Sequence, residues 1–332
     1  MKRKLSILLA LMLVLSVFAV GCSNSKDGQP ASEDQASASK EKMFVTIATG
    51  GSSGPYFAIG GAISNLLNEK LDNVNASVQS TGASAVNATL LGEKKAELAF
   101  AMNDVINYAY TGTEVFKDKG KVENLRGVAA LYPNFVQVVT LEGSGINEIS
   151  DLKGKRVGVG APGSGTEVNA RQILGAHGIT YDDIDEDFLS YSESIEQLKN
   201  GSVDAAFLTS GLPNAVIMDI CTTHDVKIVP IRKEVVEKLA KEFPFYSSEK
   251  IPAGTYDNKE DVETAAVTTL LVTRAELSED EVYEITKTIF ENIDTLHEAH
   301  SAAKRISLDT VRQGMPIPLH PGAEKYYKEQ GK

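Results

Sequence analysis

Apolar and polar positions alternate in blocks along this chain, and residues 156–178 show the plan most clearly. Two valines alternate with small residues at the start of this block, which is the pattern of a short strand. A glycine-rich loop follows, and Val168 and Ile173 then recur at helical spacing. The block is therefore predicted to be a strand, a loop and a helix, with Thr166 as the residue that caps the helix.

The first apolar segment after the leader, residues 44–49, has the same plan. A glycine-rich loop at residues 50–54 follows it, and Pro55 begins a helix that is predicted to end at Glu69. A helix that begins at a glycine turn directs several unpaired backbone N–H groups and the positive end of its dipole at one point. Such a point attracts anions, so each of the two loops is a predicted anion site.

The remaining chain also alternates between strand-like and helical patterns, which is typical of an α/β fold. Downstream of each glycine loop come a glycine, an acid and a short apolar strand, at similar spacing in the two cases. This similarity predicts two α/β lobes of related plan, each with a helix N-terminus facing a shared cleft. The further strands are predicted at residues 75–80, 98–102, 128–131, 135–141, 205–209, 226–231 and 264–273, and a long helix at residues 279–297. Another helix is predicted to begin after residue 102, with Asp104 as the residue that caps it.

The glycine loop within residues 156–178 also fits two nucleotide-binding patterns. Gly158, Gly160 and Gly163 satisfy the dinucleotide fingerprint G-x-G-x-x-G between a strand and a helix. A proline inside the turn and the position in mid-chain count against this interpretation. The loop resembles the start of a phosphate loop as well, but Thr166–Glu167 stands where Lys-Ser or Lys-Thr is required. A glutamate there would repel a triphosphate, so nucleotide hydrolysis is not expected.

The first glycine loop matches the nucleophile-elbow pattern G-x-S-x-G at Gly50, Ser52 and Gly54. In a hydrolase fold the elbow follows several earlier strands, whereas here it follows the first. None of the histidines sits in a recognisable partner motif; they are His177, His224, His297, His300 and His320. An exported serine hydrolase stays a minor alternative, and the simplest alternative is that both loops are only tight turns.

Composition and charge narrow the classes of partner. A formal net charge of −12 argues against nucleic acid and against a polybasic contact with a membrane. With 42% hydrophobic residues, the 332-residue chain has an ordinary globular composition and is long enough for two domains. It shows no Cys/His spacing suited to zinc, and we expect neither a metal nor a cofactor.

The beginning of the chain has the form of an export signal. A basic start precedes an apolar stretch at residues 5–20, and Ala-Val-Gly-Cys at residues 19–22 resembles a bacterial lipoprotein cleavage site. Residues 1–21 are therefore predicted to be a lipoprotein signal peptide that leaves Cys22 lipidated, with an ordinary signal peptide as the alternative. Residues 22–43 lack the apolar bulk needed to fold and are predicted to be a flexible tether. We expect an extracytoplasmic protein, lipid-anchored to the bacterial cell membrane.

Four separate segments carry a family resemblance. They are Ile-Ala-Thr-Gly-Gly-Ser-Ser-Gly-Pro-Tyr-Phe at residues 47–57, Gly-Ala-Pro-Gly-Ser-Gly-Thr-Glu at 160–167, Ile-Pro-Ala-Gly-Thr-Tyr at 251–256 and Pro-Leu-His-Pro-Gly-Ala at 318–323. In this combination and order the chain resembles the TAXI family, the solute-binding proteins of TRAP (tripartite ATP-independent) transporters. The resemblance covers nearly all of the chain that follows the leader.

The resemblance implies a two-lobed, periplasmic-binding-protein-like fold of type II with the ligand cleft between the lobes. Lobe 1 would comprise residues 44–131 and 230–332, and lobe 2 residues 132–229. It also implies a binding protein and not an enzyme, which captures a small organic anion such as glutamate, glutamine or 2-oxoglutarate and delivers it to the TRAP membrane subunits. A binding protein of an ABC importer with the same fold is the alternative, because the lobes do not reveal the permease.

The ligand is expected to be a small mono- or dicarboxylate, held by backbone N–H groups and hydroxyls, because the loops concerned contain no Lys or Arg. Tyr56 is expected to close over its carbon skeleton, and Asn103, Asn134 and Ser210 to contact its far end. Arg171 is near enough in sequence to be considered, but is expected to face solvent. The predicted ligand-binding residues are Thr49, Gly50, Gly51, Ser52, Ser53, Tyr56, Thr81, Gly82, Ser84, Asn103, Asn134, Pro162, Gly163, Ser164, Gly165, Thr166 and Ser210.

Overall fold

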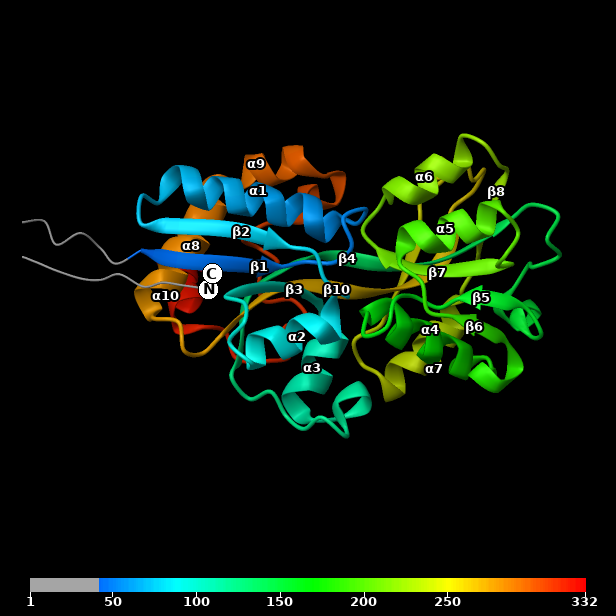
Figure 1. The fold of residues 1–332 in the computed structure, drawn as a ribbon, viewed down its shortest axis with the longest axis horizontal. Coiled ribbons are helices and arrows are strands. Elements are labelled where there is room, and N and C mark those ends of the chain that lie inside the picture. Colours follow the sequence, from blue (N-terminus) through cyan, green and yellow to red (C-terminus); the bar gives the residue numbers. More distant parts are fainter. Residues whose placement is uncertain (1–41) are drawn as a thin grey trace, which may run out of the picture. The chain divides into compact units, whose positions relative to one another are not determined.

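The computed structural model describes residues 42–332, and these residues form an α/β fold around one ten-stranded sheet (Figure 1). The strands are β1 (Met43–Ala48), β2 (Val74–Gln79), β3 (Leu98–Met102), β4 (Leu125–Leu141), β5 (Arg156–Gly158), β6 (Asp185–Asp187), β7 (Ala205–Ser210), β8 (Val226–Val229), β9 (Ser247–Ile251) and β10 (Val262–Arg274). They lie in the order β2-β1-β3-β10-β4-β7-β5-β6, with β8 paired to β4 and β9 paired to β10. The predicted α/β class is confirmed, whereas the predicted signal peptide and Cys22 lie outside the described residues.

Helices cover the sheet in two groups, which define the two lobes used below (Figure 1). The first lobe carries α1, α2, α3, α8, α9 and α10, and the second carries α4, α5, α6 and α7. The helices are α1 (Pro55–Lys70), α2 (Ser84–Gly92), α3 (Asn103–Thr111), α4 (Gly165–Ala176), α5 (Tyr191–Lys199), α6 (Ala215–Cys221), α7 (Lys233–Glu242), α8 (Glu279–Glu291), α9 (Ile293–Ala299) and α10 (Pro321–Glu329). None of the helices in this described part of the chain is long and apolar enough to cross a membrane.

Two long antiparallel strands, β4 and β10, run through both lobes. In the first lobe β10 pairs with β3, and in the second it pairs with β9. The start of β4 pairs with β10, while its second half pairs with β7 and β8. The sequence predicted two separate strands, one on each side of Tyr132–Asn134. This is wrong, because β4 continues through these residues and stays paired with β10, with a register shift near Thr268. These two continuous strands therefore join the lobes.

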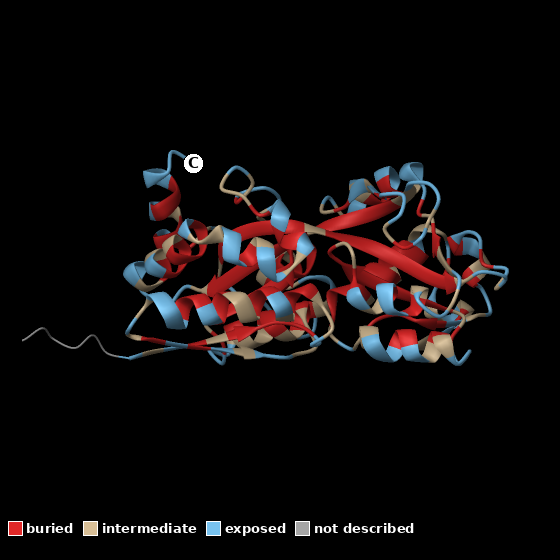
Figure 2. Ribbon diagram, turned by 90° about the horizontal axis from the view of Figure 1, so that it is seen from above, coloured by how far each residue is buried: buried red, intermediate tan, exposed pale blue. Residues whose placement is uncertain are grey.

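The buried residues lie between the sheet and the helices, as Figure 2 shows by the concentration of buried positions on the strands. In the first lobe, Ile59, Ile63 and Leu67 recur every four residues along α1 and are fully buried. They belong to one apolar cluster with Ile47 of β1. Tyr56, at the start of the same helix, stacks on Phe100 of β3 with the ring centroids 5.2 Å apart. This stacking fixes Tyr56 at the edge of the core.

Three predicted helix boundaries are wrong. Ser164, and not Thr166, caps α4, because its hydroxyl accepts a hydrogen bond from the backbone N–H of Glu167 at 3.1 Å. Asp104 does not cap α3 but lies inside its first turn, fully buried. The long helix predicted at residues 279–297 is interrupted at Asn292, where the chain leaves the helical conformation between α8 and α9.

The predicted lobe boundaries, 131/132 and 229/230, stay a prediction. After residue 230 the chain forms α7, which packs against α4 of the second lobe. The predicted strand at 226–231 corresponds to β8, which pairs with Val138–Leu141 at the far end of β4. We therefore propose that the chain returns to the first lobe along β10, later than residue 230.

Candidate functional site

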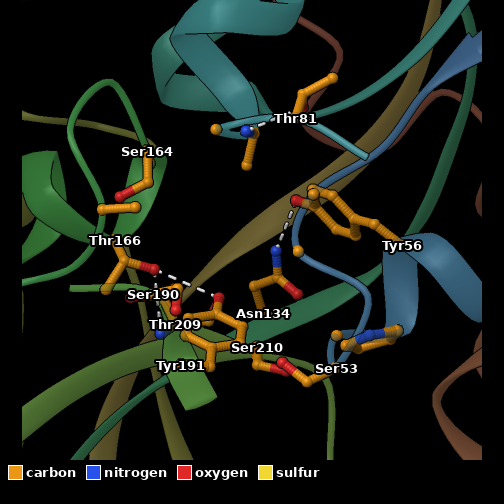
Figure 3. Close-up of a pocket in the computed structure, with 18 of the residues that line it drawn as sticks. Ser53, Tyr56, Thr81, Asn134, Ser164, Thr166, Ser190, Tyr191, Thr209 and Ser210 are labelled. Carbon is orange, nitrogen blue, oxygen red and sulfur yellow. Dashed lines mark hydrogen bonds between the residues drawn. The ribbon is translucent and has the colours of Figure 1, made fainter. Parts of the chain in front are cut away.

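A cavity lies where the carboxyl ends of strands from both lobes meet (Figure 3). Loops that follow β1, β2 and β5 contribute to it, and ligands of open α/β sheets bind outside such strand ends. It comprises about 630 Å³ of space, part of which is open to solvent. Its lining residues are Gly50, Gly51, Ser53, Gly54, Pro55, Tyr56, Thr81, Gly82, Ala83, Met102, Asn134, Ala161, Ser164, Gly165, Thr166, Ser190, Tyr191, Thr209 and Ser210.

Four helices begin at this cavity: α1, α2, α4 and α5. Their first-turn N–H groups and positive dipole ends are therefore directed at one space. At α4 the Ser164 hydroxyl satisfies the N–H of Glu167. The N–H groups of Gly165 and Thr166 find no acceptor within the described chain. These two donors remain available to an anion.

The lobes touch each other around the cavity. The N–H of Ala85 in the first lobe donates to the carbonyl of Gly163 in the second at 3.0 Å. A β-carbon at Gly165 would lie only 2.3 Å from Sδ of Met102, so the start of α4 fits against β3 only because this position is a glycine. The structure thus has the two lobes closed on the cavity.

Tyrosine and amide groups form its remaining walls (Figure 3). Nδ2 of Asn134 donates to the hydroxyl of Tyr56 at 2.8 Å. The hydroxyl of Tyr191 donates to the carbonyl of Thr209 at 2.6 Å. Burial raises the pKa of both tyrosines, that of Tyr191 to about 12, so both stay neutral at physiological pH. Among the lining residues of the described chain, none is Lys, Arg, Asp, Glu or His.

Most of the predicted ligand-binding residues lie at this cavity, although their contact with a ligand stays a prediction. Eleven positions of the two glycine loops, the Thr81 turn and the crossing strands are brought together from both lobes. They are Gly50, Gly51, Ser53, Tyr56, Thr81, Gly82, Asn134, Ser164, Gly165, Thr166 and Ser210.

Six predicted residues lie outside the lining. Thr49 is buried and donates to the carbonyl of Gln79, while Ser84 accepts from the N–H of Met102. Asn103 is engaged with the carbonyl of Gly314 and the N–H of Thr268. The structure therefore uses these three side chains to hold neighbouring segments in place. The remaining three are Ser52, Pro162 and Gly163.

The sequence pattern missed the start of α5 and, on β7, Thr209, the neighbour of the predicted Ser210. Ser190 caps α5 in a capping box with Glu193, and this Ser-x-x-Glu pattern is a visible helix-start signal. Thr209 reaches the cavity because β7 pairs with the distant strand β4. No local sequence pattern indicates that Tyr191 or Thr209 lines a cavity. The other lining residues not predicted are Gly54, Pro55, Ala83, Met102 and Ala161.

Neither a ligand contact by Arg171 nor the serine-hydrolase alternative fits this geometry. Arg171 pairs with Glu167 at 3.3 Å and with Glu114 at 3.6 Å, and it does not line the cavity. The serine-hydrolase alternative needs a histidine next to a serine, but no histidine lines the cavity in the described residues, and Ser52 is exposed outside it. Within residues 42–332 there is also no group of His, Cys, Asp and Glu side chains that could hold a metal ion.

Comparison with known proteins gives this geometry a context. Residues 47–331 match the model of the NMT1-like family. The fold is similar to that of the alkanesulfonate-binding protein SsuA from Xanthomonas axonopodis pv. citri, bound to MOPS, with 14% identity, a TM-score of 0.50 and coverage of 87% of this chain and 84% of that chain. It is also similar to a protein described as an L-cystine ABC transporter from Listeria monocytogenes, with 15% identity, a TM-score of 0.50 and coverage of 81% and 98%.

A further similar chain belongs to a structure of glutathione import through GshT and the cystine ABC importer TcyBC of Streptococcus mutans. It shares 14% identity and a TM-score of 0.50, with coverage of 83% of this chain and 100% of that chain. At such identities the likenesses show the fold. They confirm the predicted two-lobed fold of periplasmic solute-binding proteins.

Proposed function

The chain belongs to the NMT1-like family, and from this membership and the geometry of the cavity we propose that it is an extracytoplasmic solute-binding protein. In this proposal it captures a small organic anion between its lobes and presents it to a membrane permease. A carboxylate is the expected anion, and the alkanesulfonate bound by one structural relative makes a sulfonate the nearest other choice. The proposed role is binding, not catalysis.

One observation carries the proposal: the helix starts of α1, α2 and α4 converge on a cavity whose lining in the described chain has no charged side chain. An anion placed there would receive charge-assisted hydrogen bonds from backbone N–H groups. No acidic side chain of the lining would repel it. A cation would meet the same positive helix ends and would be disfavoured.

A thermal-shift screen of the mature protein tests this. Carboxylates, sulfonates, amino acids, sugars and nucleotides would each be added at high concentration. A ligand present at 100 times its dissociation constant adds about 2.7 kcal/mol of stability, which is readily measured. We expect a shift with an organic anion. A clear shift with a sugar or a nucleoside, and none with any anion, would contradict the proposal.

Two kinds of permease are candidates for the partner. Two structural relatives, one described as an L-cystine ABC transporter and one from glutathione import through a cystine ABC importer, favour an ABC importer. The four segments that resemble the TAXI family support a TRAP transporter as the second candidate. Uptake of the identified ligand into membrane vesicles separates them: an ABC importer requires ATP, whereas a TRAP transporter requires an ion gradient and is stopped by an ionophore.

We further propose that Cys22, which lies outside the described residues, is lipidated and anchors the protein. The apolar leader and the small residues before Cys22 support this. Replacing Cys22 with Ser should release the protein from membranes, because at least two lipid chains are needed for stable anchoring and none could be attached. Fractionation of cells followed by immunoblotting measures this. A Cys22→Ser protein that still pellets with membranes would place the anchor elsewhere.

A further inference from the structure

The side-chain amide of Asn134 has a hydrogen-bond partner for its nitrogen but none for its oxygen within the described chain. It lies on β4, is fully buried and lines the cavity beside the Tyr56 hydroxyl (Figure 3). Its Nδ2 donates to that hydroxyl at 2.8 Å, whereas its Oδ1 has no hydrogen-bond partner among residues 42–332. A buried carbonyl oxygen without a donor is costly, and native structures seldom leave one unsatisfied. A ligand that supplies an N–H or O–H group would remove this cost.

Thr209 repeats the situation on the neighbouring strand. Its backbone groups are both engaged, the N–H with Thr166 at 3.3 Å and the carbonyl with Tyr191 at 2.6 Å. Its Oγ1 is buried and unpartnered within the described chain. Thr209 pairs with Val136, two residues along β4 from Asn134, so the two side chains occupy the same face of the sheet. The two unpaired oxygens therefore lie on the same wall of the cavity, and they are called the polar patch below.

The charges around the cavity limit what this patch can bind. The helix starts of α1, α2 and α4 compensate one negative group, but the lining in residues 42–332 offers no cationic side chain for a second. The start of α5 also lies at the cavity, but its dipole is already opposed by the Glu193 carboxylate, which accepts from the N–H of Ser190 at 2.8 Å. The neighbouring hydroxyls of Tyr56 and Tyr191 are neutral. A second carboxylate at the patch would lose its hydration without gaining a counter-charge and would face the Asn134 oxygen. The group at the patch should therefore be uncharged.

We infer that the ligand is an organic anion whose other end carries an uncharged hydrogen-bond donor, an amide or a hydroxyl, and that Asn134 and Thr209 select for that end. The inference rests on the proposed function, because it takes the anionic end to lie at the helix starts. It goes further in excluding plain fatty acids and dicarboxylates as the preferred ligands. Asn134 contributes the acceptor, and Thr209 can either accept or donate.

Matched probes test the inference on the wild-type protein. They are butyrate, 4-hydroxybutyrate, succinamate and succinate, together with their five-carbon homologues, and calorimetry measures each dissociation constant. Within at least one chain length, we expect the hydroxyl- and amide-terminated probes to bind about tenfold or more tightly than the methyl- and carboxylate-terminated ones, because only the former pair the buried oxygens. Equal affinities, or tightest binding of the dicarboxylate, would overturn the inference and leave the proposed function standing. Binding of none of these probes would overturn the inference, whereas the proposed function would fall only if the thermal-shift screen found no binding of any organic anion.

Two leucine variants assign the selectivity to Asn134. In Asn134→Leu the preference for the amide over the methyl end should fall to near one, while the methyl-terminated probe binds no more weakly. Asn169→Leu is the matched control, because Asn169 is also fully buried with an unpaired Oδ1 but does not line the cavity. It should weaken all probes alike and keep the preference. A preference for the amide end that survives in Asn134→Leu would overturn the role of this residue. If the variant does not fold, the comparison of the probes on the wild-type protein decides whether the ligand carries an uncharged donor.

Discussion

At the scale of single residues, Asp104 is the residue whose role was predicted least well from the sequence. It is the one fully buried carboxylate among residues 42–332, and it lies on α3 where the first lobe meets the second. Its oxygens accept from the N–H of Val105 and from Nδ2 of Asn169 on α4, both at 2.8 Å. The same Nδ2 lies 2.8 Å from the hydroxyl of Tyr246. A residue predicted to cap a helix is thus part of a polar contact between the lobes.

This contact should make ligand binding depend on pH. Burial raises the pKa of Asp104 to about 6, above its ordinary value near 4, so the closed form takes up a proton more readily than an open form in which the carboxyl is solvated. The surrounding hydroxyls of Tyr108 and Tyr246 have raised pKa values and stay neutral in this range. Closure should therefore be favoured as the pH falls through 6, and the advantage is lost as it rises. We expect roughly tenfold tighter ligand binding at pH 5 than at pH 7.

Calorimetry across this pH range measures the effect, with Asp104→Asn as the control. The asparagine keeps the shape and cannot titrate, so its binding should no longer change between pH 5 and pH 7. An affinity of the wild-type protein that is independent of pH, or a dependence retained by Asp104→Asn, would show that this carboxyl does not report on closure.

At the scale of elements, the sequence predicted what depends on local periodicity. The predicted strand at residues 98–102 coincides with β3, and the predicted helix from Pro55 to Glu69 differs from α1 by one residue. Both have apolar positions that can be recognised within one segment. The side of the cavity formed by Tyr191 and Thr209 could not be predicted in this way, because it depends on β7 pairing with β4 some 70 positions earlier in the chain. Local sequence therefore predicted the loops that contribute to the site better than it predicted their opposite wall.

The close fit of α4 against β3 gives a test at this scale. A methyl group at Gly165 would lie 2.3 Å from Sδ of Met102, which itself lines the cavity. Gly165→Ala must either push Met102 into the cavity or separate the lobes, and overpacking of this kind costs about 1–3 kcal/mol. Ligand affinity should fall roughly tenfold or more. Gly175→Ala is the matched control on the same helix, because nothing lies within 4 Å of the added methyl group. Equal affinities of the two variants in calorimetry would contradict the close fit.

At the scale of the whole described molecule, the contacts between the lobes lead us to expect that they separate when ligand is exchanged. Ala85 binds Gly163 on one side of the cavity, and Gln172 donates to the hydroxyl of Tyr108 at 3.1 Å beyond the Asp104 contact. These contacts hold the lobes against each other at the cavity, so opening it further requires that they break. Because only β4 and β10 join the two parts of the sheet, a bend in these two strands is the simplest way to separate the lobes.

Small-angle X-ray scattering of the mature protein should therefore show a smaller radius of gyration with saturating ligand than without it. The ligand contributes contacts to both lobes only when they are closed, so it shifts the population towards the closed form by its differential affinity. The Gly165→Ala variant provides the internal comparison, since its added methyl group opposes closure, and it should contract less than the Gly175→Ala variant at the same ligand saturation. A radius of gyration that is unchanged by ligand in the wild-type protein would mean that the lobes do not open in solution, and ligand entry would then require a local path through the loops at the cavity mouth.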